Sequence, residues 1–368
     1  TMMVEDAYAG VEAGKRGGFG LVLGVGRGEN AERLLHYGAD IVVADLGEID
    51  LAQITAWFSE RLPSSCWELE YHGFHDEEER LREALTTVGN GYFGTRGSLP
   101  SERINDNLHN PGTYVAGLFD RAGTEVHERT IYNNDFVNCP NWTLVTVHVD
   151  GGPALSPHCC ETVSYRHWLE LRAATAKHEL TLRDEEGRIT TVRSERFASM
   201  TKPHLGAMRL TVTPVNHSSP IEIRSSIDGD VSNFLVERYR ELEQKHLDPV
   251  ASEERENGVY LEMKTRNSDH AVCMRARTSV SGADSDRRFV RDTASATEIF
   301  TAGPAEGTSV TLEKLVAIYT GKDHDTDDPA GASETLARGV GSYEEEHAAH
   351  CDRWAELWEG ADVVIEGD

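Results

Sequence analysis

The chain has 368 residues, and its 36 Lys and Arg against 63 Asp and Glu give a formal net charge of −27. Such an excess of negative charge repels phosphate backbones, so we expect no nucleic-acid partner. The chain is 39% hydrophobic and 27% charged, which is typical of a globular protein of two or three domains. It contains neither an apolar run of the roughly 18 residues that a membrane span needs nor a secretory pattern. We therefore expect a cytoplasmic protein with no membrane partner.

Residues 1–62 alternate short apolar runs with amphipathic stretches. The periodicity predicts helices over residues 7–16, 31–37 and 51–61, and strands over residues 20–25 and 41–44. Strands separated by helices of this length indicate parallel β-α-β units. So few strands make an incomplete doubly wound sheet, because such sheets need helices on both faces and usually more strands.

Beyond the breaker at residues 63–65, the pattern becomes that of an antiparallel sandwich. Short β-branched and aromatic runs bounded by turn signals predict strands over residues 144–149, 179–183, 189–197, 208–214, 221–227, 259–265, 271–280 and 309–319. Helices are predicted over residues 236–246, 333–338 and 342–357, with Ser333 and Ser342 as N-caps and Glu345 completing a capping box. We divide the chain into an α/β piece (1–62), a sandwich (63–330) and linker helices (331–368).

A carboxylate pair, Glu5-Asp6, lies where the first strand should end and the first helix begin. Open parallel sheets place ligand groups at this edge, and paired carboxylates suit Mg²⁺. The alternative is that Asp6 is a helix N-cap. The stretch from Glu5 to Val25 resembles the last conserved motif of haloacid-dehalogenase-type phosphatases and phosphomutases, most closely the β-phosphoglucomutase group. This resemblance implies that Asp6 is a direct Mg²⁺ ligand and Glu5 its neighbour in the metal's shell.

That family also needs a D-x-D nucleophile pair, a Ser or Thr, and a Lys, which would all precede Thr1. We therefore expect residues 1–62 to be an inert remnant with an orphaned metal site, because a phosphoaspartyl intermediate cannot form without its aspartate. A dinucleotide-binding fingerprint at residues 24–28, with Asp45 ending the next strand, is a competing interpretation. Glu29 argues against it, since an acid in place of the third glycine would face the pyrophosphate.

Three motifs follow one another in the sandwich region: TVGNGYFGTRG at residues 87–97, PGTYVAG at 111–117 and VNCPNW at 137–142. Together they resemble the N-terminal domain of glycoside hydrolase family 65, which contains maltose, trehalose and kojibiose phosphorylases. The resemblance extends from about Trp67 to Asp368. It implies a mainly β fold, a large sandwich like that of galactose mutarotase, whose loops border an active site built elsewhere.

Four residues of these motifs are candidates for contact with sugar: Arg96, Asn138, Asn141 and Trp142. Guanidinium and amide groups donate hydrogen bonds, and an indole offers an apolar face. The alternative is that these side chains serve domain-interface packing and turn hydrogen bonds.

The resemblance implies that the acid Glu and the phosphate-binding residues belong to an (α/α)6 barrel beyond residue 368. We therefore expect a non-catalytic fragment of a bifunctional enzyme, in which a phosphorylase makes β-glucose 1-phosphate and a fused mutase converts it with Mg²⁺. The chain itself should need no cofactor. Expected partners are the barrel, an α-glucosyl disaccharide, phosphate and a second copy of the chain. Alternatives are a carbohydrate-binding or oligomerisation module, and a parent enzyme that hydrolyses rather than phosphorolyses.

The last predicted helix carries a stripe at helical spacing: Tyr343, His347, His350, Trp354 and Leu357. The stripe packs either on the barrel or on the sandwich itself, and periodicity alone does not distinguish the two.

Overall fold

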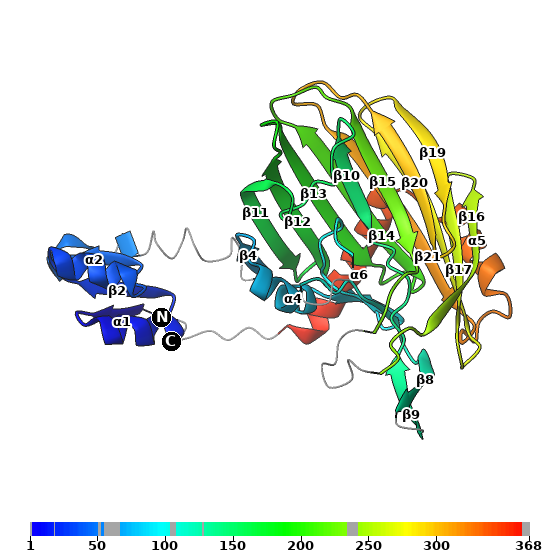
Figure 1. Ribbon diagram of the computed structural model, residues 1–368, viewed down its shortest axis with the longest axis horizontal. Coiled ribbons are helices and arrows are strands. Elements are labelled where there is room, and N and C mark those ends of the chain that lie inside the picture. Colours follow the sequence, from blue (N-terminus) through cyan, green and yellow to red (C-terminus); the bar gives the residue numbers. More distant parts are fainter. Residues whose placement is uncertain are drawn as a thin grey trace. The chain divides into compact units, whose positions relative to one another are not determined.

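The computed structural model describes residues 2–17, 19–50, 53–54, 67–103, 108–126, 129–233 and 242–362. The chain divides into two compact units, Thr1–Glu68 and Leu69–Asp368 (Figure 1). Among the described helices, none is long and apolar enough to cross a membrane.

The first unit is built on a small parallel sheet. Its strands β1 (Met2–Glu5), β2 (Leu21–Val25) and β3 (Ile41–Val43) lie in that order, and α1 (Tyr8–Arg16) and α2 (Glu29–His36) connect them. A 3-10 turn, η1 (Leu46–Glu48), follows. Both strand pairs are parallel, which confirms the predicted β-α-β units. The helix predicted over residues 51–61 lies almost wholly outside the described residues.

The second unit is an antiparallel sandwich, as predicted. One sheet has nine strands in the order β16-β17-β18-β21-β14-β13-β12-β11-β4, and the other has four in the order β10-β15-β20-β19. Their bounds are β4 (Glu68–His72), β10 (Val145–Val149), β11 (Glu161–Glu170), β12 (Thr175–Arg183), β13 (Ile189–Ala198), β14 (Leu205–Pro214), β15 (Ile221–Asp228), β16 (Leu247–Arg255), β17 (Gly258–Thr265), β18 (Ala271–Ser281), β19 (Ser285–Arg291), β20 (Ser295–Ala302) and β21 (Val310–Thr320).

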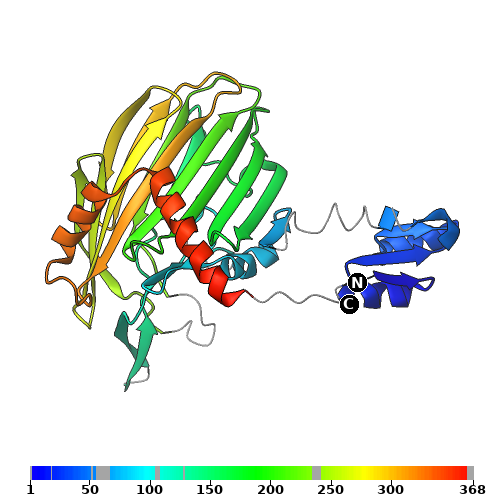
Figure 2. The same ribbon diagram turned by 180° about the vertical axis from the view of Figure 1, so that it is seen from behind.

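The main core lies between these two sheets. Met208 and Leu210 of β14 point inward and meet Val147 of β10 and Ile223 of β15 in one buried cluster. Alternate residues of a strand face opposite sides, so the remaining apolar residues of β14 need a second cover. Helices α5 (Pro329–Gly339) and α6 (Tyr343–Ala361) provide it on the outer face of the nine-stranded sheet (Figure 2). With apolar residues on both faces, the central strands carry the long hydrophobic runs seen in the sequence.

The contacts of helix α6 decide whether the first half of its stripe packs on the sandwich or elsewhere. Tyr343 and His350 are buried and pack against Phe197 of β13, with ring centroids 5.5 and 4.5 Å apart. The predicted capping box is present, because Ser342 accepts from the Glu345 amide while the Glu345 carboxylate accepts from the Ser342 amide. The first half of the stripe therefore packs on the sandwich.

Two helix predictions need correction, and one helix was not predicted. The N-cap of α5 is Asp328, which accepts from the Gly331 amide at 2.9 Å, and Ser333 lies inside the helix with its hydroxyl donating to the Ala330 carbonyl. Pro329 at the first helical position favours this earlier start. Residues 242–246, the described end of the helix predicted over 236–246, are not helical. Helix α4 (Asp76–Leu85) was not predicted, although its acidic first turn favours a helix N-terminus.

Candidate functional site

The three sequence motifs come together in space. Residues 87–97 and 111–117 form a small sheet of β5 (Val88–Gly89), β6 (Phe93–Thr95) and β7 (Thr113–Val115). The third motif joins it through the Cys139 amide, which donates to the Thr113 carbonyl at 2.7 Å, and reaches β15 through the Asn141 amide, which donates to the Asp228 carbonyl at 2.7 Å. We call these three motif segments the motif junction.

Gly112 lets two side chains of the junction approach each other. A Cβ at this position would lie 2.7 Å from the Tyr114 ring and 3.1 Å from Cδ of Arg96. Any larger residue would therefore displace one of them, because protein interiors leave no room for such close contacts. The packing of Arg96 beside Tyr114 thus explains Gly112, the first glycine of the PGTYVAG motif.

One side of the Arg96 guanidinium is held by contacts with its neighbours. Its Nη2 donates to the Arg80 carbonyl at 2.8 Å and lies 3.8 Å from the buried Glu83 carboxylate. Its Nε is buried, and so is the Tyr114 hydroxyl; neither has a hydrogen-bond partner among the described residues. Burial raises the pKa of Tyr114 to about 12, so the hydroxyl remains a donor at neutral pH. Two buried polar groups without a described partner thus lie at one place, and a water or ligand that reached them would satisfy both.

Arg96 and Tyr114 line a hollow of about 360 Å³ together with aromatic side chains. Phe136 stacks on Tyr114 and on Phe119, with centroid distances of 5.2 Å for both pairs, and Phe119 is 52% exposed. Phe119 and Phe136 belong to the hairpin of β8 (Phe119–Val126) and β9 (Arg129–Phe136). We call this the junction hollow. It combines an aromatic surface with a guanidinium, as sugar sites do.

The junction hollow contains residues that sequence reasoning did not single out. Tyr92 and Tyr114 both line it and both stand inside the quoted motifs, so the motifs themselves held the signal. Phe136 directly precedes the third motif. No local pattern identifies it, because it reaches the hollow through the pairing of β8 with β9.

The two predicted asparagines make structural hydrogen bonds, long-range for Asn138 and local for Asn141. Asn138 accepts from the Thr113 amide and donates to the Ser232 carbonyl, both at 3.1 Å. The Asn141 side chain accepts from the amide and the hydroxyl of Thr143 at 3.0 and 2.8 Å. Both are the contacts that a structural role requires. A sugar contact for these two residues stays a prediction.

Trp142 lies in the core. It is fully buried, its ring meets Phe93 edge-on at 6.5 Å, and a Cβ on Gly206 would lie 2.9 Å from it. In this packing the indole has no open face for a sugar. Of the four predicted contact residues, the structure brings Arg96 alone to the junction hollow.

The carboxylate pair of the first unit lies where it was expected. β1 ends at Glu5 and α1 begins at Tyr8, with Asp6 exposed between them. The N-cap of α1 is Ala7, which makes no side-chain capping hydrogen bond, so the interpretation of Asp6 as the N-cap is wrong. The helix starts one residue too late for it. A role of Glu5 and Asp6 in metal binding stays a prediction.

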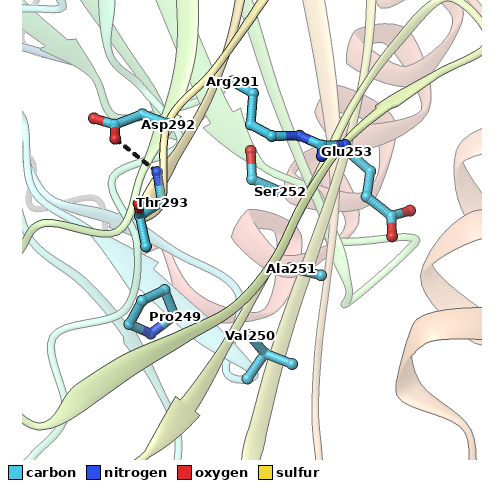
Figure 3. A pocket seen from close by; sticks show the side chains of 8 residues that line it. All are labelled: Pro249, Val250, Ala251, Ser252, Glu253, Arg291, Asp292 and Thr293. Carbon is cyan, nitrogen blue, oxygen red and sulfur yellow. Dashed lines mark hydrogen bonds between the residues drawn. The ribbon is translucent and has the colours of Figure 1, made fainter.

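Another hollow, of about 540 Å³, lies between β16 and the turn after β19 (Figure 3). Its acidic residues are Glu253 and Asp292, whose carboxylates point away from each other in the figure. Asp292 accepts from the Thr293 amide at 2.6 Å. Two carboxylates in this orientation do not form an acid–base pair.

Comparison with known proteins matches residues 69–357 to the N-terminal domain of glycosyl hydrolase family 65. An uncharacterized glycosyl hydrolase of Mycobacterium tuberculosis is 38% identical over 82% of this chain and 23% of its own length. A kojibiose phosphorylase of Thermoanaerobacter brockii is 27% identical, covering 82% and 39%. A maltose phosphorylase of Bacillus subtilis is 25% identical, covering 82% and 40%.

Among solved structures, a putative kojibiose phosphorylase from the human microbiome has the same fold over 81% of this chain and 38% of its own. The TM-score is 0.70 and the sequence identity 13%. This chain thus spans less than half the length of these relatives.

Proposed function

Because the chain belongs to glycosyl hydrolase family 65, whose N-terminal domain it carries over residues 69–357, we propose that it is the sandwich domain of a disaccharide phosphorylase. The match to phosphorylases of kojibiose and maltose over four fifths of the chain carries the proposal. The enzyme would split an α-linked glucose disaccharide with phosphate to give β-glucose 1-phosphate. Such a reaction consumes inorganic phosphate and yields a charged sugar phosphate, and we place it in the cytoplasm.

The chemistry needs two groups that we assign to a catalytic barrel outside this chain. Inverting phosphorolysis requires a general acid at the glycosidic oxygen and a phosphate that attacks from the opposite face. The junction hollow offers neither, since no carboxylate of the described residues lines it and the raised pKa of Tyr114 makes its hydroxyl a poor acid. Its role in the proposal is to contact the sugar through Arg96 Nε, the Tyr114 hydroxyl and the aromatic surface.

The test uses the longer protein that contains this chain. With kojibiose, maltose or trehalose and inorganic phosphate, we expect β-glucose 1-phosphate, identified by its phosphorus and anomeric proton resonances. Release of glucose without consumption of phosphate would instead identify a hydrolase. The 368-residue chain by itself should give no turnover, and sustained turnover would place the catalytic groups inside it.

The contact with sugar is tested separately. Tyr114→Phe removes the hydroxyl and keeps the ring, and Arg96→Gln removes the charge. Each change should raise KM for the disaccharide, while the fold reported by circular dichroism stays unchanged. Tyr132→Phe, in the exposed hairpin, serves as the control. Unchanged KM in both junction variants would show that the hollow does not touch the sugar.

We further propose that residues 1–62 are the end of a haloacid-dehalogenase-type β-phosphoglucomutase domain, fused so that one domain makes the substrate of the other. The placement of Glu5 and Asp6 after a parallel strand supports this, because ligand groups gather at that edge. The longer protein should convert β-glucose 1-phosphate to glucose 6-phosphate only with Mg²⁺, and Asp6→Ala should abolish the conversion. Retained conversion in Asp6→Ala would contradict the assignment.

A second candidate function is assembly. The β8–β9 hairpin exposes apolar side chains on both faces, with Phe119 and Tyr132 on one and Ile131 on the other. Exposed apolar surface often marks an interface. Sedimentation of the chain should then show a dimer that Ile131→Lys dissociates. A monomer at all concentrations would remove this candidate.

A further inference from the structure

Two parts of the chain that are far apart in the sequence meet beside α4. His109 and His158 direct their Nε2 atoms at each other, 2.8 Å apart, and the Glu102 carboxylate lies 3.9 Å from the His109 Nε2. One potential ligand atom from each of these three residues lies within 4.8 Å of the other two. The other Glu102 oxygen accepts from the Ser101 hydroxyl at 2.9 Å, which helps to orient the carboxylate.

A second carboxylate is hydrogen-bonded to one imidazole, and another carboxylate lies near the other imidazole. His109 Nδ1 donates to Glu83 at 2.8 Å, and both residues are 1% exposed. The other Glu83 oxygen accepts from the Asn110 amide at 2.9 Å, so this carboxylate is fixed. Asp76 lies 3.8 Å from His158 Nδ1. A carboxylate on Nδ1 leaves the Nε2 lone pair free for a metal, and metal-binding histidines almost always have such a partner.

A hydrogen bond between the two rings accounts for only part of this arrangement. Since His109 donates through Nδ1, its Nε2 carries a lone pair, and His158 would have to donate the proton between them. The Glu102 oxygen nearest the histidines then faces a lone pair. A dication in place of that proton would satisfy all three atoms at once.

The electrostatics favour a cation at this point. The carboxylates of Glu83 and Glu102 place negative charge beside the His109 ring, and negative charge attracts a metal ion. Tetrahedral zinc would need the two nitrogens about 3.3 Å apart. His158 is partly exposed and has room to make that small adjustment.

We propose that Glu102, His109 and His158 bind Zn²⁺, with water as the fourth ligand and with Glu83 and Asp76 orienting the histidines. Two imidazoles and one carboxylate are a ligand set that zinc accepts. The ion would join α4 to Glu102, His109 and the segment around His158. It would also act on the junction hollow, because Glu83 lies 3.8 Å from the Arg96 guanidinium.

The test is calorimetric titration of the chelator-treated 368-residue chain with Zn²⁺. We expect one ion per chain with a dissociation constant on the order of micromolar or tighter. His158→Ala and Glu102→Gln should each weaken binding by about tenfold or more, as loss of a ligand or its partner does. His324→Ala, an exposed histidine outside the cluster, is the matched control and should change nothing.

Two further measurements keep the test decisive. Co²⁺ in the same site should give the intense visible absorption of a four-coordinate ion, which His158→Ala removes. Zn²⁺ should raise the melting temperature of the unmodified chain and of His324→Ala but not that of Glu102→Gln. If His158→Ala misfolds, Asp76→Asn, at an exposed carboxylate, replaces it and should weaken binding by a smaller factor. Absence of binding, or binding by His158→Ala and Glu102→Gln as tight as that of the unmodified chain, would overturn the site.

Discussion

The two units bury cores of very different size. In the first, Val11, Val22, Leu34 and Ala39 form the described cluster. In the second, one cluster draws residues from nearly every strand of both large sheets. A parallel sheet needs covers on both faces, whereas two antiparallel sheets cover each other. The stability of a unit therefore depends on the size of its buried core as well as on its secondary structure. We expect the sandwich to be far more resistant to unfolding than the first unit.

The largest expected effect is in the sandwich core. Trp142→Ala should lower the free energy of unfolding by about 3–5 kcal/mol, because it empties a fully buried ring site against Gly206. Urea unfolding followed by circular dichroism measures it. Trp168→Ala, at a half-buried ring on which Arg166 stacks at 4.0 Å, is the control and should cost less. Equal losses would mean that Trp142 is not a core residue.

The next prediction separates the two units. Leu34→Ala should destabilise the first unit by about 2–5 kcal/mol, since Leu34 is fully buried in a small cluster. Hydrogen exchange should speed up in the first unit and stay unchanged in the sandwich. The neighbouring Leu35, 52% exposed, provides the control Leu35→Ala, which should leave both units unchanged. Faster exchange in both units after Leu34→Ala would show that they unfold together.

Buried charge should make the sandwich sensitive to pH. Burial lowers the pKa of Lys314 from 10.5 to about 7, although Glu298 opposes the shift. Between these values the unfolded chain holds a proton that the folded chain lacks, so this residue makes stability rise from about pH 7 to pH 10.5. Lys314→Met should flatten the rise in urea unfolding midpoints. The control Lys15→Met, at an exposed lysine of the first unit, should leave this rise in the sandwich unchanged.

Helix capping offers a smaller and paired contrast. Ser342→Ala removes the cap of α6 in the sandwich unit and should cost about 1 kcal/mol, whereas Ser342→Gly should cost only a few tenths. In the first unit, α1 begins at Ala7 without a side-chain cap. Ala7→Ser should therefore stabilise that unit by about 0.5–1 kcal/mol. Thermal unfolding measures the stability change of each unit. A loss of stability on Ala7→Ser would mean that α1 starts at another residue.

The smallest effect concerns Mg²⁺ at the first unit. Glu5 and Asp6 supply one direct ligand by our prediction, and Mg²⁺ usually needs one or two carboxylates plus phosphate and water. The 368-residue chain should therefore bind it with a dissociation constant on the order of millimolar or weaker. Calorimetry that finds micromolar affinity, lost in Asp6→Asn, would reveal further ligands in the chain.

Much of the local structure could be predicted from sequence. Strands such as β14 and β18 were found because alternating or continuous apolar runs reflect how many of their faces are buried. The capping box at Ser342 was found because it depends on residues three positions apart. Helix α4 is not predicted, because a mostly charged segment gives little apolar periodicity. Strands β11 and β19 are not predicted, because their mixed polar and apolar residues blur the alternation.

The sequence by itself determined the family motifs, the mainly β architecture and the position of the carboxylate pair after β1. Only the tertiary structure decided that Arg96 lines the junction hollow while Trp142 fills the core. It also decided that Glu102, His109 and His158 meet. The reason is physical: a motif constrains residues that are close in the chain, whereas burial and ligand geometry depend on strand pairing and loop paths that join segments many residues apart.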